Sequence, residues 1–162
     1  MIYAATAFHW VDAAIGCPKA LRLLKNGGVF ALFRYNAVPA DGKKLYEEIQ
    51  SVYEKYFHKP YVRPVKIEKS DYEKPSEIFR GFRCNALKDY GFVDVTMKSY
   101  EATRSFGAED YVSLMDTMPD HRSLANDDRA ALYAGIKEAI LNHGGQIEVD
   151  YVFQLYMGRK CD

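Results

Sequence analysis

The residues best suited to chemistry follow the first apolar run of the chain. His9 and Trp10 come directly after residues 2–7 (IYAATA), a run of strand length. An imidazole placed there can accept a proton from a substrate or donate a hydrogen bond to its carboxylate, and an aromatic ring can stabilise a nearby cation. The alternative is structural: Phe8 and Trp10 close the end of a sheet, and His9 caps the helix that follows.

A second polar group follows the next apolar run, residues 29–33 (VFALF). In open α/β sheets, ligands bind in the crevice outside the carboxyl ends of the strands. Arg34 at that place can hold a substrate carboxylate through two parallel hydrogen bonds, with Tyr35 and Asn36 beside it. The alternative is an ordinary polar surface loop.

Other reactive residue types show no pattern of a catalytic or metal site. The histidines lack the spacing of a zinc-binding pair, no serine stands in a GxSxG motif, and the three cysteines form no CxxC pair. A basic stretch between Lys59 and Lys69 is offset by acidic residues nearby. The sequence therefore predicts no metal, no disulfide framework and no nucleic-acid partner.

Composition places the chain among ordinary globular proteins. Of its 162 residues, 48% are hydrophobic and 27% are charged, and 22 basic residues balance 22 acidic ones. The zero net charge argues against nucleic-acid binding, and no apolar run approaches the roughly 20 residues of a membrane-spanning helix. The first residues lack the basic start of a signal peptide. We expect one domain, residues 1–162, in the cytoplasm and with no membrane partner.

Apolar periodicity predicts alternating strands and helices. Strands are expected at residues 2–7, 29–33, 92–100 and 147–157, and helices at 43–58, 77–88, 109–118 and 127–143. A further helix begins after Asp12, which can cap it. Gly16 and Pro18 are expected to interrupt this helix, and Asn26-Gly27-Gly28 to end it. The chain thus starts with a strand–helix–strand unit.

Two segments carry a resemblance to a known family. AATAFHWVD, a helix and then LRLLKNGGVFALF resemble the middle of class I S-adenosylmethionine-dependent methyltransferases, in the group that includes trans-aconitate methyltransferase. The ending NHGGQIEVDYVFQLYMGRK resembles the last helix and antiparallel strand of that family. Asn26 stands where the family usually has proline, and Asn-Gly makes that turn equally well.

The resemblance implies an α/β fold, a partial Rossmann-like methyltransferase sheet. Its strands would correspond to the family's fourth to seventh strands in the order 4-5-7-6, with the last strand antiparallel. Helices would cover both faces, and a helical insertion would lie on the substrate side. Three β/α units of the family, roughly 90 residues at about 30 per unit, would precede the first strand here.

The segment that would precede the first strand carries the family's glycine-rich cofactor loop. No GxGxxG-like pattern follows a strand in this chain, since Gly27-Gly28 and Gly144-Gly145 both follow helices. The implied cofactor is S-adenosylmethionine, with its main binding loop absent from these residues. The resemblance implies site residues near a methyl group: catalytic His9 and Trp10; substrate-binding Arg34, Tyr35, Asn36 and Tyr111; cofactor-binding Ala5, Thr6 and Phe8.

Two functions remain open at this point. The first is methyl transfer to a small molecule, with O-methylation of a carboxylate favoured and no activity expected from the isolated chain. The second is a non-catalytic α/β remnant that binds a partner or itself. Its first strand would then be an exposed apolar edge, and such edges recruit partners. We therefore expect a homodimer, or association through residues 2–7.

Overall fold

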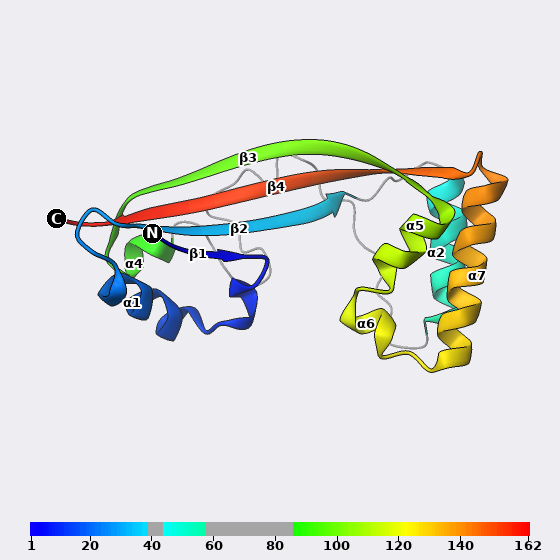
Figure 1. Ribbon diagram of the computed structural model, residues 1–162, viewed down its shortest axis with the longest axis horizontal. Helices are drawn as coiled ribbons and strands as arrows, with labels where there is room; N and C mark the ends of the chain where they lie inside the picture. The colour runs from blue at the N-terminus through cyan, green and yellow to red at the C-terminus, as the bar shows by residue number, and fades with distance from the viewer. Residues whose placement is uncertain (39–43, 58–85) are drawn as a thin grey trace. The chain divides into compact units, whose positions relative to one another are not determined.

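The computed structural model describes residues 1–38, 44–57 and 86–162. Its described strands form one sheet, with the elements labelled in Figure 1. The strands are β1 (Ile2–Ala5), β2 (Val29–Val38), β3 (Phe92–Gly107) and β4 (Gln146–Lys160). The helical elements are η1 (Phe8–Trp10), α1 (Ala13–Leu23), α2 (Lys44–Tyr56), α4 (Ala86–Asp89), α5 (Ala108–Met115), α6 (Pro119–Arg122) and α7 (Asn126–Asn142).

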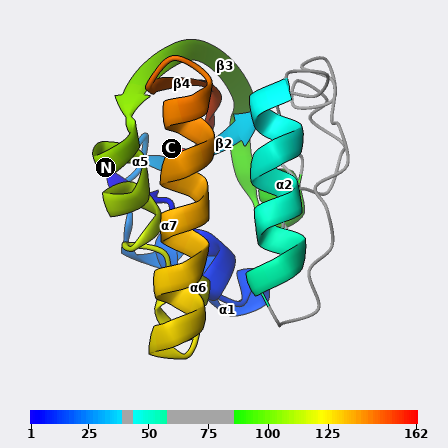
Figure 2. The same ribbon diagram turned by 90° about the vertical axis from the view of Figure 1, so that its right-hand side faces the viewer.

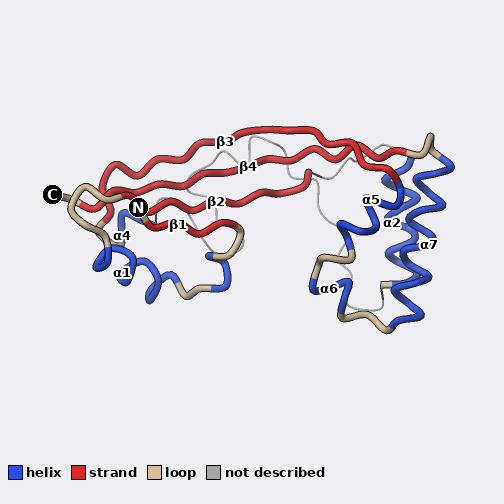
Figure 3. The backbone as a smooth tube through the Cα atoms, viewed as in Figure 1, coloured by secondary structure: helices blue, strands red, loops and turns tan. Residues whose placement is uncertain are grey.

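The strand order is β1-β2-β4-β3, as the family resemblance implied. β1 and β2 are parallel, with Ile2 opposite Phe30, and the other strand pairs are antiparallel. Figure 3 shows the four strands running side by side as red tubes. The predicted 4-5-7-6 order and the antiparallel last strand are therefore confirmed.

A glycine turn joins α1 to β2 and fixes the start of that strand. Gly27 has a φ of 70°, in the left-handed region that favours glycine. Its backbone nitrogen donates to the Lys160 carbonyl at 3.1 Å, and Lys160 N donates to the Gly28 carbonyl at 2.9 Å. The predicted turn is confirmed, and it ties the beginning of β2 to the end of β4.

Helix α1 begins where the sequence predicted but is not interrupted. Asp12 caps it, because its Oδ1 accepts a hydrogen bond from the Ala14 backbone nitrogen at 2.9 Å. Pro18 lies inside the helix, where a proline removes one backbone hydrogen bond. The expected break at Pro18 is therefore wrong. Burial of Cys17 and Ala20 on the inner side of the helix compensates for the lost bond.

The described chain forms two compact units. Of the described residues, the first unit contains 1–37, 86–102 and 151–162, and the second contains 38, 44–57 and 103–150. Each unit has its own hydrophobic cluster. The single domain expected from the sequence remains a prediction. None of the described helices is both long and apolar enough to cross a membrane.

In the first unit, α1 and α4 pack on one face of the sheet. Phe30 and Leu32, two residues apart on β2, point to that face and join its cluster. The Phe30 ring stacks on Phe92 of β3 with 5.5 Å between centroids. The buried members of the cluster are Cys17, Ala20, Leu24, Phe30, Leu32, Leu87, Phe92 and Tyr156. Helices on the second face remain a prediction.

The second unit contains a helical group built around α7. Figure 2 shows α2 and α7 running alongside each other. They approach closely at Gly135, where an added Cβ would lie 2.7 Å from Val52 Cγ1. Leu132, Ile136 and Ile140 form the buried stripe of α7, which lies in the helix that the sequence predicted at 127–143.

Candidate functional site

The candidate site lies where β1 and β2 end. These neighbouring strands are parallel, with Ala5 opposite Phe33. Their carboxyl ends therefore meet at one edge of the sheet, where ligands bind in open α/β folds. The backbone nitrogen of Thr6 donates to the Phe33 carbonyl at 2.7 Å. This hydrogen bond holds the carboxyl ends of β1 and β2 together.

Thr6, directly after the end of β1, has an unusual backbone conformation. Its φ of 47° lies in the left-handed region, which is a genuine outlier for a β-branched residue. Strain of this kind costs about 1–3 kcal/mol and is concentrated at functional sites. The sharp turn follows the end of β1 at Ala5, where the sequence predicted a strand to Ala7, and η1 begins at Phe8.

The loop that carries His9 is fixed by the packing of Phe8. The Phe8 ring meets Phe30 edge to face at 5.4 Å between centroids. Underneath lies Gly16 of α1, where an added Cβ would be 2.7 Å from Val11 Cγ1 and 3.0 Å from the Phe8 ring. A glycine in the middle of a helix is normally unfavourable. Here it allows the loop to lie directly on α1.

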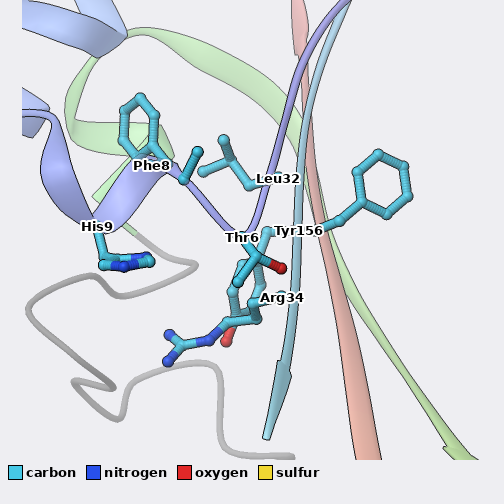
Figure 4. Close-up of a pocket in the computed structure, with 8 residues that line it drawn as sticks. Thr6, Phe8, His9, Leu32, Arg34 and Tyr156 are labelled. Carbon is cyan, nitrogen blue, oxygen red and sulfur yellow. The ribbon is translucent and has the colours of Figure 1, made fainter. Parts of the chain in front are cut away.

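A small cavity brings several predicted residues together. Its volume is about 30 Å³, far below the roughly 300–1,000 Å³ of a small-molecule pocket. Figure 4 shows the His9 imidazole and the Arg34 guanidinium projecting to the same side of the strand ends. The lining residues are Thr6, Ala7, Phe8, His9, Leu32, Phe33, Arg34 and Tyr156.

A larger cavity lies beside it in the same unit. Its volume is about 300 Å³, at the lower end of the range for small ligands. The two cavities share Thr6, Phe33 and Arg34. Aromatic rings form much of the larger wall, which consists of Thr6, Phe33, Arg34, Tyr35, Tyr100, Phe153, Gln154 and Leu155.

Asn36 has a different environment from its neighbours on β2. It is buried, and its Nδ2 donates to Gln154 Oε1 at 3.2 Å. The amide pair satisfies two buried polar side chains within the sheet. Asn36 therefore supports the strand from which Arg34 projects, and its contact with a substrate remains a prediction.

Of the remaining predicted residues, Tyr35 lines the larger cavity, whereas Trp10 and Tyr111 line neither. Trp10 is 81% exposed and does not line either of them, although its ring lies 4.9 Å from that of His9. Tyr35 contacts the rings of Tyr151 and Phe153. Tyr111 belongs to the second unit, where its ring packs near Phe106.

Five lining residues come from later strands and were missed, namely Tyr100, Phe153, Gln154, Leu155 and Tyr156. Tyr156 and Gln154 on β4 and Tyr100 on β3 reach the cavities only through the antiparallel pairing of these strands. Alternation along 147–157 was visible in the sequence, but not the register that sets Gln154 beside Asn36. The register itself was the missing information.

The described residues do not by themselves fit S-adenosylmethionine. In this part of the chain, no strand is followed by a glycine-rich turn that opens a helix, which is the element that lets a backbone approach such a cofactor. The cavity beside His9 is also too small for it. Thr6 and Phe8 line the small cavity and Ala5 does not, and the contact of these three residues with a cofactor remains a prediction.

No metal site is present among the described residues, and the buried Cys17 thiol is unreactive. They contain no group of three His, Cys, Asp or Glu side chains able to hold a metal ion. Burial raises the pKa of the Cys17 thiol to about 11. Cys17 is therefore protonated at neutral pH and inert as a nucleophile.

Comparison with known proteins gives a likeness of fold. No family model matches the chain, and no curated protein sequence matches it either. A proposed type II methyltransferase from Anaeromyxobacter dehalogenans is similar with a TM-score of 0.53 and 16% identity, over 98% of this chain and 63% of that one. A proposed methyltransferase from Bacillus halodurans has a TM-score of 0.43 and 20% identity, over 98% and 67%.

The YcgJ protein of Bacillus subtilis is similar with a TM-score of 0.42 and 14% identity, over 99% of this chain and 63% of that one. Of these three structures, the one from Anaeromyxobacter has a TM-score above one half. It confirms the methyltransferase fold that the sequence resemblance implied. The chain spans about 63% of the length of that structure.

Proposed function

We propose that this chain is the substrate-side part of an S-adenosylmethionine-dependent methyltransferase that acts on a small molecule. The observation that carries the proposal is the convergence of Thr6, Phe8, His9 and Arg34 at the ends of two adjacent parallel strands. In a methyltransferase fold, a loop at that edge is available to position a methyl acceptor. The favoured reaction is O-methylation of a carboxylate.

The chain's own contribution is to bind and orient the acceptor. Methyl transfer depends mainly on holding the acceptor atom in line with the methyl donor. Arg34 binds a substrate carboxylate through two parallel hydrogen bonds. His9 donates a hydrogen bond to a carboxylate acceptor, or takes the proton from a hydroxyl acceptor. Tyr35 and the rings around it bind the apolar part of the substrate.

The methyl donor requires further residues. Because the described residues lack a glycine-rich loop, we expect the isolated chain to bind the cofactor weakly and to transfer no methyl groups. This division makes the proposal testable in two separate parts, acceptor binding and cofactor binding.

The test uses the chain alone and measures acceptor binding and cofactor binding separately. Titration with small dicarboxylic acids should shift the amide resonances of Thr6 and His9 in NMR spectra, and Arg34→Ala should abolish these shifts. Arg22→Ala is the matched control, because Arg22 is an exposed arginine on α1. Calorimetric titration with S-adenosylhomocysteine should give no detectable heat.

Two results would contradict the proposal. Carboxylates that leave Thr6 and His9 unshifted would remove the acceptor site. Micromolar binding of S-adenosylhomocysteine would mean that these loops, alone or in a dimer, already form a cofactor site, and the proposed division between the two parts would be wrong.

Self-association is a second candidate function, favoured by the exposed edge of β1. β1 is the terminal strand of the described sheet and carries no charged side chain. Tyr3 on this strand is 64% exposed and meets the exposed Phe33 ring edge to face at 6.4 Å. Uncharged, apolar edge strands pair readily with a second chain. We expect a homodimer joined through β1.

Light scattering should therefore give a mass of twice 18.5 kDa at micromolar concentration. Tyr3→Lys should reduce it to the monomer mass, because a charge on an edge strand opposes pairing. Leu141→Lys, an equally exposed apolar position on α7, should leave the mass unchanged. A monomeric unmodified chain would exclude association through β1.

A further inference from the structure

The helical group of the second unit encloses a buried histidine. His121 lies on α6 and is only 3% exposed. Aromatic rings from two other helices surround it. The centroid distances are 5.6 Å to Tyr53, 5.7 Å to Phe57 just after α2, and 5.8 Å to Tyr133 on α7, which stacks on the imidazole.

Among the described residues, the imidazole has one hydrogen bond, and this bond crosses between helices. Nε2 lies 3.1 Å from the Tyr53 hydroxyl, which also lies 3.6 Å from Met115 Sδ on α5. Nδ1 is buried and has no hydrogen-bond partner among the described residues. A neutral imidazole tolerates this arrangement, with Nε2 as donor and Nδ1 as an unused acceptor. An imidazolium does not, since both nitrogens are then donors.

The charged groups around the ring are already engaged. Asp116, after α5, accepts from the Tyr133 hydroxyl at 3.2 Å and faces Arg122 at 3.5 Å and Arg129 at 3.9 Å. Asp120 accepts from the backbone nitrogen of His121 itself. α2 presents Tyr53, α5 presents Met115, and α7 presents Tyr133 and Arg129. The described residues therefore provide no acceptor for a proton on Nδ1.

We propose that His121 makes the packing of the helical group sensitive to acid. In its neutral form it joins α2, α6 and α7 through the Tyr53 hydrogen bond and the ring contacts. When His121 takes up a proton, the buried imidazolium has no acceptor among the described residues for the proton on Nδ1. The helices of this group then separate, while the first unit stays folded. This inference does not depend on methyl transfer.

The direction of the pH effect follows from burial. Burial lowers the pKa of His121, and Asp120 and Asp116 offset this only in part. The opened form has the ordinary pKa of about 6.5. Above pH 6.5 both forms are neutral and stability is constant. Below it the opened form takes up the proton first, so opening becomes up to tenfold more favourable per pH unit until the folded pKa is reached.

Hydrogen exchange of the whole chain between pH 7.5 and 5 tests this proposal. After correction for intrinsic exchange rates, amides in α2 and α7 should open more with each step below pH 6.5, and β2 amides should not. His121→Phe, which keeps an aromatic ring, should abolish the response. His143→Gln is the control, because His143 is exposed and paired with Glu48 at 2.8 Å in the same unit.

A second measurement is independent of any variant. The ring resonances of His121 in the unmodified chain should titrate with a midpoint below that of a free histidine. A midpoint at or above 6.5, or exchange in α2 and α7 that does not change with pH, would overturn the proposal. Loss of the response in His143→Gln, or its persistence in His121→Phe, would overturn it as well.

Discussion

His9→Ala is expected to lower kcat/KM for methyl transfer about 100-fold, the lower end of the usual contribution of a positioned acid or base. His9 lines the cavity at the ends of β1 and β2, on the same side as Arg34. Since its proposed role is to orient or deprotonate the acceptor atom, the loss should fall on kcat, and KM for the acceptor should change little.

The measurement uses the complete enzyme, meaning this chain together with the residues that bind the cofactor, with labelled S-adenosylmethionine and the best acceptor from a screen of small carboxylic acids. Added imidazole should restore part of the rate. His143→Ala is the matched control, because it removes an exposed histidine from the other unit. An unchanged kcat in His9→Ala would mean that His9 takes no part in the reaction, since Asp12 already caps the following helix.

Leu132→Ala should lower the free energy of unfolding by about 2–5 kcal/mol, the usual cost of truncating a fully buried leucine. Leu132 is 0% exposed and lies in the cluster that α7 forms with its neighbouring helices. The cost combines the lost burial of the side chain with the cavity that remains. Urea unfolding followed by circular dichroism measures it.

Leu141→Ala on the same helix is the matched control. Leu141 is 65% exposed, and surface substitutions of this kind usually change stability by about 0.5 kcal/mol or less. Both substitutions remove the same atoms and have the same effect on helix propensity. Equal effects would therefore show that the α7 stripe is not the core of this group.

The long helices were the most predictable part of the fold. The helix expected at 127–143 is α7, because a repeating apolar stripe over four turns has no other regular interpretation. The strands were found but their ends were not. The expected strand 92–100 continues to Gly107, and 29–33 continues to Val38, because pairing with a neighbouring strand extends a strand beyond its apolar part.

Local propensity failed where packing determined the outcome. Gly16 and Pro18 are expected helix breakers, yet α1 passes through both because Cys17 and Ala20 are buried against the sheet. The turn at Thr6 also had no sequence signal, since a β-branched residue rarely adopts a positive φ. In each case a tertiary contact outweighed the local preference.

The sequence predicted the location of the candidate site but not all of the residues that line it. The positions of His9 and Arg34 after two apolar runs were enough to infer a shared edge, because parallel strands end together. Tyr156 required the β4 register, which alternation alone does not give. His121 had no predicted role, because only the three-dimensional packing reveals that its ring is enclosed.

The glycine beneath the His9 loop has a consequence for efforts to improve this protein. Alanine at position 16 would favour the helix by about 1 kcal/mol, but its methyl group would lie 2.7 Å from Val11 and 3.0 Å from the Phe8 ring. Helix stability and loop position thus place opposite demands on one residue. A screen for stabilising substitutions in α1 would accordingly have to leave position 16 out if the His9 loop is to keep its place.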